Sequence, residues 1–257
     1  MSTYVFSDVH GHRAPLERVL GRISPSDDDR FFCLGDMIDR GPDPIGVLRL
    51  VRSLPNVHVL MGNHEDLMIS CLDNPHDPLA TMNWGINGGA ATSDGLANMP
   101  VDEANELVSW VQGLPRWDQV VVGDTRYLLV HAGVCLDAQE PDVWDDGSAA
   151  AYLSAQDGED LSWIREEFWG APHGLSREDG SGPIVVAGHT PTPYLERMTK
   201  DVDRSPMDER GLAQMVRVGK DRWDIDCCAA GGYGIGQVLV LRLDDGEEFY
   251  EPVGEGE

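Results

Sequence analysis

Short apolar runs recur along most of the chain, and each is bounded by turn residues. Five of these runs are rich in β-branched and aromatic residues, which is typical of buried strands. They are YVFSD (4–8), FFCLGD (31–36), VHVLMGN (57–63), YLLVHAG (127–133) and IVVAGHT (184–190). Between the first three runs lie helical patterns, one over 15–21 and one over 45–54. This alternation predicts an α/β sheet with crossover helices.

The remaining segments have weaker patterns. Residues 66–115 are mainly helical in pattern, and 154–169 contains another amphipathic stretch. Alternating segments at 215–229 and 237–251 predict two hairpins, with turns at Gly219-Lys220-Asp221 and Asp245-Gly246. Residues 197–212 are polar and have little periodicity, which predicts a mobile loop.

The length of 257 residues suits one large domain, and no repeat or long linker divides the chain, so we expect a single domain over residues 1–257. No run of about 18 apolar residues predicts a transmembrane helix. The first residues lack the pattern of a signal peptide. The five cysteines lack metal-finger spacing and suit a reducing compartment. We therefore expect a cytoplasmic protein.

The chain is strongly acidic, with 19 Lys and Arg, 45 Asp and Glu, and a net charge of −26. Such a surface repels nucleic acids and anionic membranes, so we expect neither as a partner. It also repels anionic phosphate substrates. A site that binds phosphate would need a local source of positive charge.

Each of the five apolar runs ends in residues that can bind a metal ion. These residues are Asp8, His10, Asp36, Asn63, His131 and His189. In α/β sheets, sites form where the carboxyl ends of strands meet. A single histidine at a strand end is usually structural, but packing does not explain imidazole and carboxylate groups at five strand ends. The pattern therefore predicts a metal site.

Six nitrogen and oxygen ligands without thiolate favour Mn²⁺, with Fe or Zn²⁺ as alternatives, over Ca²⁺. Six side chains exceed what one metal in an open catalytic site needs. Two divalent ions about 3.5–4 Å apart that share a carboxylate would use them all. Asp36 follows the central strand and is the expected bridge. Such a pair would also supply the missing positive charge.

Five motifs occur in a fixed order: SDVHGH (7–12), GDMIDRGP (35–42), GNHE (62–65), HAG (131–133) and GHTP (188–191). Together they resemble the phosphoprotein phosphatase (PPP) group of the calcineurin-like metallophosphoesterases. The resemblance implies two mixed β-sheets packed as a sandwich flanked by helices, with a dinuclear metal centre at the sheet edge. This architecture replaces the single open sheet suggested by the apolar runs. Residues 224–237 resemble the bacterial IDTGAxxGG form, which indicates a bacterial-type serine/threonine protein phosphatase.

The resemblance also implies a role for each motif residue. Asp8 and His10 would bind the first metal ion, Asp36 would bridge, and Asn63, His131 and His189 would bind the second. His64 would be the general acid, and Asp39 would hold its orientation. Arg40 would bind phosphate oxygens. Glu65 and Asp66 are better explained as helix N-terminal carboxylates.

Two further segments have two interpretations each. SWIREEF (162–168) resembles a segment that supplies a second phosphate-binding arginine, which would be Arg165; the alternative is a surface charge beside Glu166 and Glu167. NWGINGGAAT (83–92) resembles a segment near the substrate cleft; the alternative is a turn around Asn87-Gly88.

The resemblance implies direct attack on phosphorus by a metal-bridging hydroxide. The expected function is removal of phosphate from phosphoserine or phosphothreonine, and from phosphotyrosine as a further substrate. Phosphoproteins or phosphorylated small molecules would be the partners. Symmetrical bis(5'-nucleosyl)-tetraphosphatases share the metal motifs, but GNHE and the intact Asp39 favour the phosphatase. A catalytically silent scaffold that recognises phosphorylated partners is the third hypothesis.

Overall fold

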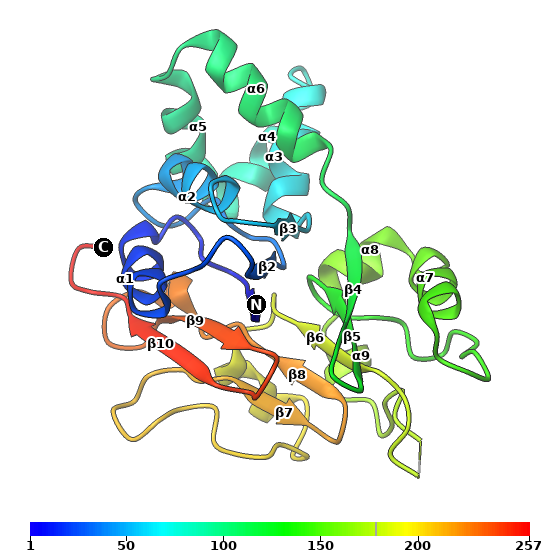
Figure 1. The fold of residues 1–257 in the computed structure, drawn as a ribbon. Coiled ribbons are helices and arrows are strands. Elements are labelled where there is room, and N and C mark those ends of the chain that lie inside the picture. The colour runs from blue at the N-terminus through cyan, green and yellow to red at the C-terminus, as the bar shows by residue number, and fades with distance from the viewer. Residues whose placement is uncertain (178) are drawn as a thin grey trace.

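A computed structural model describes residues 1–177 and 179–257, and its strands form two five-stranded sheets (Figure 1). Sheet I has the strand order β10-β9-β1-β2-β3. Strands β1, β2 and β3 run parallel, whereas β9 is antiparallel to β1 and to β10, so the sheet is mixed. The strands are β1 (Thr3–Phe6), β2 (Arg30–Cys33), β3 (Val57–Val59), β9 (Gln237–Arg242) and β10 (Glu248–Pro252).

Sheet II has the strand order β4-β5-β6-β8-β7 and is also mixed. Strand β6 runs parallel to β5 and to β8, and the edge strands β4 and β7 are antiparallel to their neighbours. The strands are β4 (Trp117–Val122), β5 (Thr125–Val130), β6 (Ile184–Ala187), β7 (Val216–Val218) and β8 (Arg222–Asp224). Sheet II thus has a parallel centre with antiparallel edges, whereas sheet I is parallel over β1, β2 and β3 and antiparallel over β9 and β10.

A shared apolar layer holds the two sheets together. Val5 of β1, Leu129 of β5, Val186 of β6 and Leu239 of β9 are buried in one cluster that draws on both sheets. Side chains alternate between the two faces of a strand, so Phe6 points to the opposite side of sheet I. The fold is therefore a sandwich, with helices against its outer faces, and the architecture implied by the sequence motifs is confirmed. The single open sheet suggested by the apolar runs is wrong.

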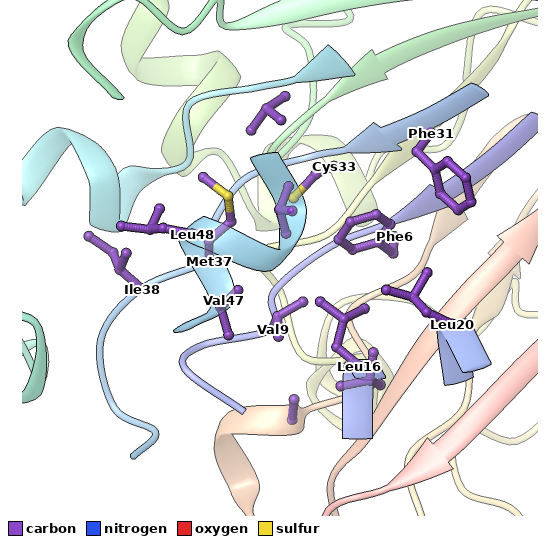
Figure 2. Close-up of a cluster of buried hydrophobic side chains, with 14 of the residues drawn as sticks. Phe6, Val9, Leu16, Leu20, Phe31, Cys33, Met37, Ile38, Val47 and Leu48 are labelled. Atoms are coloured by element: carbon purple, nitrogen blue, oxygen red, sulfur yellow. The ribbon is translucent and has the colours of Figure 1, made fainter. Parts of the chain in front are cut away.

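Helices cover the outer face of sheet I. Phe6 and Phe31 of β1 and β2 pack with Leu16 and Leu20 of the first helix, as Figure 2 shows. The helices whose buried residues join this layer are α1 (Arg13–Ile23), α2 (Pro44–Arg52), α3 (Asn63–Asp73), α4 (Pro78–Ile86) and α6 (Val101–Gln112). Helix α5 (Ala90–Ala97) packs on α2 and α6, and α3 to α6 fill the region expected to be helical.

A second helical layer packs on sheet II. It contains α7 (Asp146–Ser154), α8 (Gly158–Trp163) and α9 (Glu166–Trp169), which lie beside β4 and β5 in Figure 1. The pattern over 154–169 suggested one amphipathic stretch, but the structure divides it into α8 and α9. The carbonyl of Leu161 accepts a hydrogen bond from the N–H of Ala132, 2.9 Å away, and not from Arg165. Helix α8 ends because Ile164, with ψ 139°, takes an extended conformation, and the carbonyl of Leu161 is then left to bond with Ala132.

The remaining sequence predictions are confirmed in part. The hairpins β7–β8 and β9–β10 are confirmed. Strand β4, which pairs with β5, was not predicted from the sequence. Residues 198–212 have the irregular backbone expected, anchored by bridges from Val202 to Val218 and from Met207 to Ala213; mobility there stays a prediction. Over the described residues, no helix is long and apolar enough to cross a membrane.

Candidate metal centre and active site

The six predicted metal ligands converge at one edge of the sandwich. Strands β1, β2, β5 and β6 end one to three residues before the next predicted ligand, which is Asp8, Asp36, His131 or His189. Asn63 is the first residue of α3, which begins where the chain leaves β3. All six side chains belong to buried residues: Asp8, His10, Asp36, Asn63, His131 and His189. The sequence prediction that these residues share one site agrees with their placement.

Backbone conformation sets this edge apart from the rest of the fold. Nine described residues other than glycine have positive φ, and six of them lie in this site. They are Asp8, His10, Asp36, Asp39, Arg40 and His189, with φ between 46° and 69°. The left-handed conformation costs about 1–2 kcal/mol for a residue with a Cβ atom. These turns explain why the strands are shorter than the apolar runs, and such strain is concentrated at functional sites.

The hydrogen bonds of His131 indicate a position suited to a cation. Its Nδ1 lies 2.9 Å from the carbonyl oxygen of Leu34, which can only accept, so Nδ1 carries the proton. In the neutral ring, Nε2 then bears a lone pair. That lone pair faces Oδ1 of Asn63 at 2.9 Å and Oδ1 of Asp36 at 3.4 Å, both acceptors. A cation between the three atoms would satisfy all of them.

His10 repeats the arrangement on the other side of Asp36. Its Nδ1 lies 3.0 Å from the carbonyl oxygen of Ile38 and therefore donates. Its Nε2 faces Oδ2 of Asp36 at 3.4 Å and Oδ1 of Asp8 at 3.9 Å. Among the described residues, Oδ1 of Asp8 has no hydrogen-bond partner although it is buried. A buried carboxylate oxygen without a partner is costly unless a cation binds it.

The distances between ligand atoms suit divalent ions. With metal–ligand bonds of about 2.0–2.2 Å, neighbouring ligand atoms around one ion lie about 3.0–3.5 Å apart. Oδ1 of Asn63 lies 2.9 Å from Nε2 of His131 and 2.9 Å from Nδ1 of His189. Two groups, His10–Asp36–His64 and Asp36–His131–His189, have ligand atoms within 4.8 Å of one another. Asp36 belongs to both, as a bridging carboxylate would.

The pKa shifts in the site follow mainly from burial of its ionisable groups. Burial lowers the pKa of His10 well below its usual value, and the neighbouring His64 and Arg40 lower it further. Burial also lowers the pKa values of His131 and His189. Burial raises the pKa of Asp36, as does the charge of Asp8. The imidazoles are therefore neutral near pH 7, with lone pairs free for a metal.

His64 and its neighbours form a second arrangement within the site. Nδ1 of His64 lies 2.7 Å from Oδ2 of Asp39, and because a carboxylate accepts, Nδ1 donates. Nε2 lies 2.9 Å from Nη2 of Arg40, a donor. A guanidinium at that distance excludes a metal ion from Nε2. The geometry therefore separates His64 from the six ligands, although it lies within the first group.

Glu65 is buried and serves the backbone. Its carboxylate accepts hydrogen bonds from the N–H groups of Asp36, Met37 and Gly62 at 2.8 to 3.0 Å. Burial raises its pKa to about 7. The sequence analysis placed Glu65 at a helix N-terminus, which is correct, but missed its bonds to the turn that carries Asp36. The motif offers no signal for them, because the partners lie 28 and 29 residues away in sequence.

Arg165 occupies the break between α8 and α9, with φ −133° and ψ −87°. It is half-buried, and its charge helps to lower the pKa of His189, after burial and the neighbouring His131. The ring of Trp163 meets that of His189 edge-on, with centroids 5.7 Å apart. The structure thus places Arg165 beside the second ligand group. The alternative of a charge on an exposed helix face does not describe this position.

The segment 83–92 also lies at the site. Nε1 of Trp84 donates to the carboxylate of Asp39, and the carbonyl of Gly88 accepts from the N–H of Arg40. Of the two interpretations of this segment, the one that places it near the cleft agrees with these contacts. Helix α4 and the turn after it therefore pack against Asp39 and Arg40.

Asp224 and Asp226 are buried acids beside the site that the sequence analysis left without a role. Burial raises the pKa of each well above its usual value, and the charge of Asp8 adds to the shift of Asp226. Oδ1 of Asp224 accepts from the N–H of Asp226, and Oδ1 of Asp226 accepts from the N–H of Cys228. Only the resemblance of 224–237 to a bacterial motif pointed to this segment.

Comparisons with known proteins agree with this geometry. The symmetrical bis(5'-nucleosyl)-tetraphosphatase of Erwinia tasmaniensis is 30% identical over 154 residues, which cover 59% of this chain and 49% of that protein. The protein of the same name from Shewanella putrefaciens is 28% identical over 199 residues, which cover 74% of this chain and 58% of that protein. The chain thus spans about half the length of the curated relatives it matches.

Solved structures share the fold. A crystal structure assigned as a diadenosine tetraphosphatase has a TM-score of 0.57 at 18% identity and covers 99% of this chain and 94% of its own. The cold-active protein-tyrosine phosphatase of a Shewanella species has a TM-score of 0.52 at 18% identity, covering 97% of this chain and 80% of its own. Residues 1–231 match the family described as calcineurin-like phosphoesterase. The chain therefore belongs to this family of phosphoester hydrolases, whose members use a dinuclear divalent metal centre.

Proposed function

We propose that this protein hydrolyses phosphate monoesters with two divalent cations held by the six converging ligands. Asp8 and His10 would bind the first ion, Asn63, His131 and His189 the second, and Asp36 both. Two observations support this proposal. Imidazole nitrogen atoms face amide and carboxylate oxygen atoms with no hydrogen-bond donor between them, and the family uses a dinuclear centre. Nitrogen and oxygen ligands without thiolate favour Mn²⁺, with Fe or Zn²⁺ as alternatives.

When bound, the two cations supply Lewis acidity and positive charge at the phosphoryl group. The chain's own cations add to this. Arg40 and Arg165 would bind the phosphoryl oxygens, since a guanidinium pairs with them through two parallel N–H groups. Both arginines lie near buried residues of the proposed centre. Burial is the main cause of the lowered pKa values of His10 and His189, and the charge of Arg40 adds to the first shift and that of Arg165 to the second.

His64 would protonate the leaving oxygen. Asp39 accepts from Nδ1, which fixes the orientation of the ring and leaves Nε2 as the atom that would act on the leaving oxygen. In the present arrangement Nε2 accepts from Arg40. A phosphoryl group that draws the Arg40 guanidinium away would free Nε2 to carry the proton that it then donates. Asp39 acts on the substrate only through His64.

The Asp39–His64 pair is the observation that favours a phosphoserine or phosphothreonine substrate. An alkoxide is strongly basic and leaves slowly without a proton, so a general acid contributes most to these esters. ADP leaves as a weakly basic phosphate and needs an acid less. The residue Glu65, by contrast, contacts backbone and not substrate, so the GNHE motif does not by itself distinguish the two activities.

Symmetrical cleavage of a bis(5'-nucleosyl) tetraphosphate is the second candidate, because the curated relatives cited above carry that name. The two candidates would use the same metal ligands and arginines. They differ in the leaving group, and in whether the surface around the centre must bind a peptide or a nucleotide.

A paired assay of the Mn²⁺-loaded protein tests the proposal. One arm follows phosphate release from a phosphothreonine peptide, and the other follows ADP release from diadenosine tetraphosphate. We expect faster turnover of the peptide. Faster release of ADP would replace the protein phosphatase with the tetraphosphatase and leave the site assignment unchanged. No turnover in either arm, with two metal ions bound, would favour the phosphate-recognising scaffold.

A further inference from the structure

The segment from Trp84 to Thr92 contacts two consecutive residues of the site at three points. Nε1 of Trp84 lies 3.1 Å from Oδ2 of Asp39 and 3.2 Å from Oδ1. The N–H of Arg40 donates to the carbonyl of Gly88 over 3.1 Å. Oγ1 of Thr92 donates to Oδ1 of Asp39 over 2.5 Å. The three contacting residues come from the end of α4, the turn after it and the start of α5, so the whole connection packs against the Asp39–Arg40 pair.

Thr92 makes two bonds with Asp39. Its hydroxyl donates to the carboxylate, and the same oxygen accepts from the N–H of Asp39 at 3.0 Å. The hydroxyl thus fixes the side chain and the backbone of one residue. Thr92 and Asp39 are both 0% exposed, so no water replaces the hydroxyl if it is lost.

The carboxylate of Asp39 is fully engaged by this arrangement. It accepts from the indole of Trp84, the hydroxyl of Thr92 and Nδ1 of His64. A carboxylate that accepts three hydrogen bonds in a buried position has one favoured orientation. The orientation of His64 follows from that of Asp39, because the bond between them is the only one that Nδ1 makes among the described residues.

The backbone of this pair requires such support. Asp39 and Arg40 have φ values of 69° and 66°, two left-handed residues in succession, neither of them glycine. Conformations of this kind persist where the surrounding structure holds them. Gly88, with φ 101°, comes close enough to do so: a Cβ atom there would lie 2.9 Å from Cγ of Arg40 and 3.2 Å from its N atom.

We propose that Trp84, Gly88 and Thr92 form a positioning clamp that holds Asp39 and Arg40, and through Asp39 the general acid His64, in the geometry for protonating the leaving group. This inference rests on the proposed function and deepens it. None of the clamp residues is among the six proposed metal ligands or the two proposed phosphate-binding arginines. They are positioning residues, and Thr92 is the member whose removal tests the clamp most directly.

Leaving-group dependence distinguishes positioning from general loss of structure. A misplaced general acid slows esters with strongly basic leaving groups and spares p-nitrophenyl phosphate, whose leaving group needs no proton. For Thr92→Val, which keeps the shape and removes the hydroxyl, we expect kcat on a phosphothreonine peptide to fall about tenfold. Thr92 bonds to Asp39, whereas Gly88 holds the backbone of Arg40, so we expect the phosphate-binding arginine to stay in place and kcat on p-nitrophenyl phosphate to change less than about twofold. Thr92→Ser should restore both, and Ser93→Ala, the loss of an exposed hydroxyl next door, should change neither.

A proton NMR measurement makes the test independent of turnover. The Nδ1–H of His64 should give a downfield signal, assigned by its absence in His64→Asn. We expect the signal in the wild type and in Thr92→Ser, and its shift or loss in Thr92→Val and Trp84→Phe. An unchanged signal together with an unchanged leaving-group dependence in Thr92→Val would overturn the clamp. An inactive wild type in which the signal depends on Thr92 would overturn the proposed function and leave the clamp standing.

Discussion

Nδ1 of His64 lies 2.7 Å from Oδ2 of Asp39, and neither side chain is exposed to solvent. The two residues are 25 positions apart in sequence: Asp39 lies between β2 and α2, and His64 is the second residue of α3. Six metal ligands alone would make a cation site; this pair beside them adds a group that can deliver a proton. Under the proposed function, rapid release of a strongly basic leaving group therefore depends on His64.

Replacing His64 separates these two roles. For His64→Asn we expect turnover of a phosphothreonine peptide to fall by about 10²- to 10⁴-fold, the usual contribution of a general acid. Metal content should remain that of the wild type, because Nε2 of His64 faces Arg40 and not the cation positions. Elemental analysis and initial rates measure the two quantities. A loss of metal that parallels the loss of turnover would make His64 a ligand.

Arg165 should contribute to substrate binding. For Arg165→Lys, which keeps the charge and loses the planar fork, we expect KM for the peptide to rise by about tenfold. Glu167→Gln serves as a matched control, since this neighbour is exposed and lies on the short helix α9. Steady-state kinetics of both variants measure the effect. Equal KM values for the wild type and Arg165→Lys would remove Arg165 from the phosphate-binding site.

Divalent cations should stabilise the fold. The buried acceptors around Asp36 repel one another without a cation, so chelation should lower the melting temperature and abolish turnover. Adding Mn²⁺ at about 100 times its Kd should restore about 2.7 kcal/mol of stability. Thermal unfolding with and without Mn²⁺ measures the gain. Asp36→Asn should lose most of it, whereas Asp28→Asn, which changes an exposed loop carboxylate, should keep it.

Glu65 should impose a pH dependence on the stability of the metal-free protein. Its pKa rises from an ordinary value of 4.5 to about 7 in the folded state, mainly through burial. The folded state therefore binds this proton more tightly than the unfolded chain, so the contribution to stability is greatest below pH 4.5 and declines as pH rises through 7. Urea unfolding of the metal-free protein from pH 4.5 to 8 measures the decline.

The matched variants isolate that effect from other titrating groups. Glu65→Gln should be less stable than the wild type throughout, because its amide cannot accept from all three backbone N–H groups. Its stability should nevertheless decline less between pH 4.5 and 7. Glu255→Gln, an exposed glutamate, should follow the wild-type curve. A Glu65→Gln curve parallel to that of the wild type would contradict the raised pKa.

Gly35 should be intolerant of any side chain. It has φ 99°, and a Cβ atom there would lie 2.4 Å from the backbone N of Gly62. Gly35→Ala would push apart the turns that carry Asp36 and Asn63, so we expect a loss of more than about 3 kcal/mol. At Gly123, with φ 60° and open space around the Cβ position, alanine should cost only about 1–2 kcal/mol. Similar losses at the two positions would show that the approach of the turns is not tight.

The ligands could be found from sequence because each follows an apolar run that forms its own strand. A β-branched or aromatic run ending in a turn is a local signal, and Asp8, Asp36 and His131 come directly after such runs. Pairing between neighbouring parallel strands then brings the ends together. The motif resemblance added the sandwich, which the apolar runs alone did not predict, because a strand's periodicity does not say which sheet it joins.

The amino-acid sequence is enough to identify the candidate residues at the strand ends, which are the six predicted ligands together with His64, Asp39 and Arg40. How these side chains are held depends on the tertiary structure. Glu65 accepts from the backbone of Met37, 28 residues away, Thr92 lies 53 residues from Asp39, and Ala132 donates to the carbonyl of Leu161 in α8. Such contacts leave no local pattern, because a buried polar group takes whichever partner the packing brings to it. The local hydrophobic pattern therefore identifies the candidate residues, and long-range packing sets the orientation of their side chains.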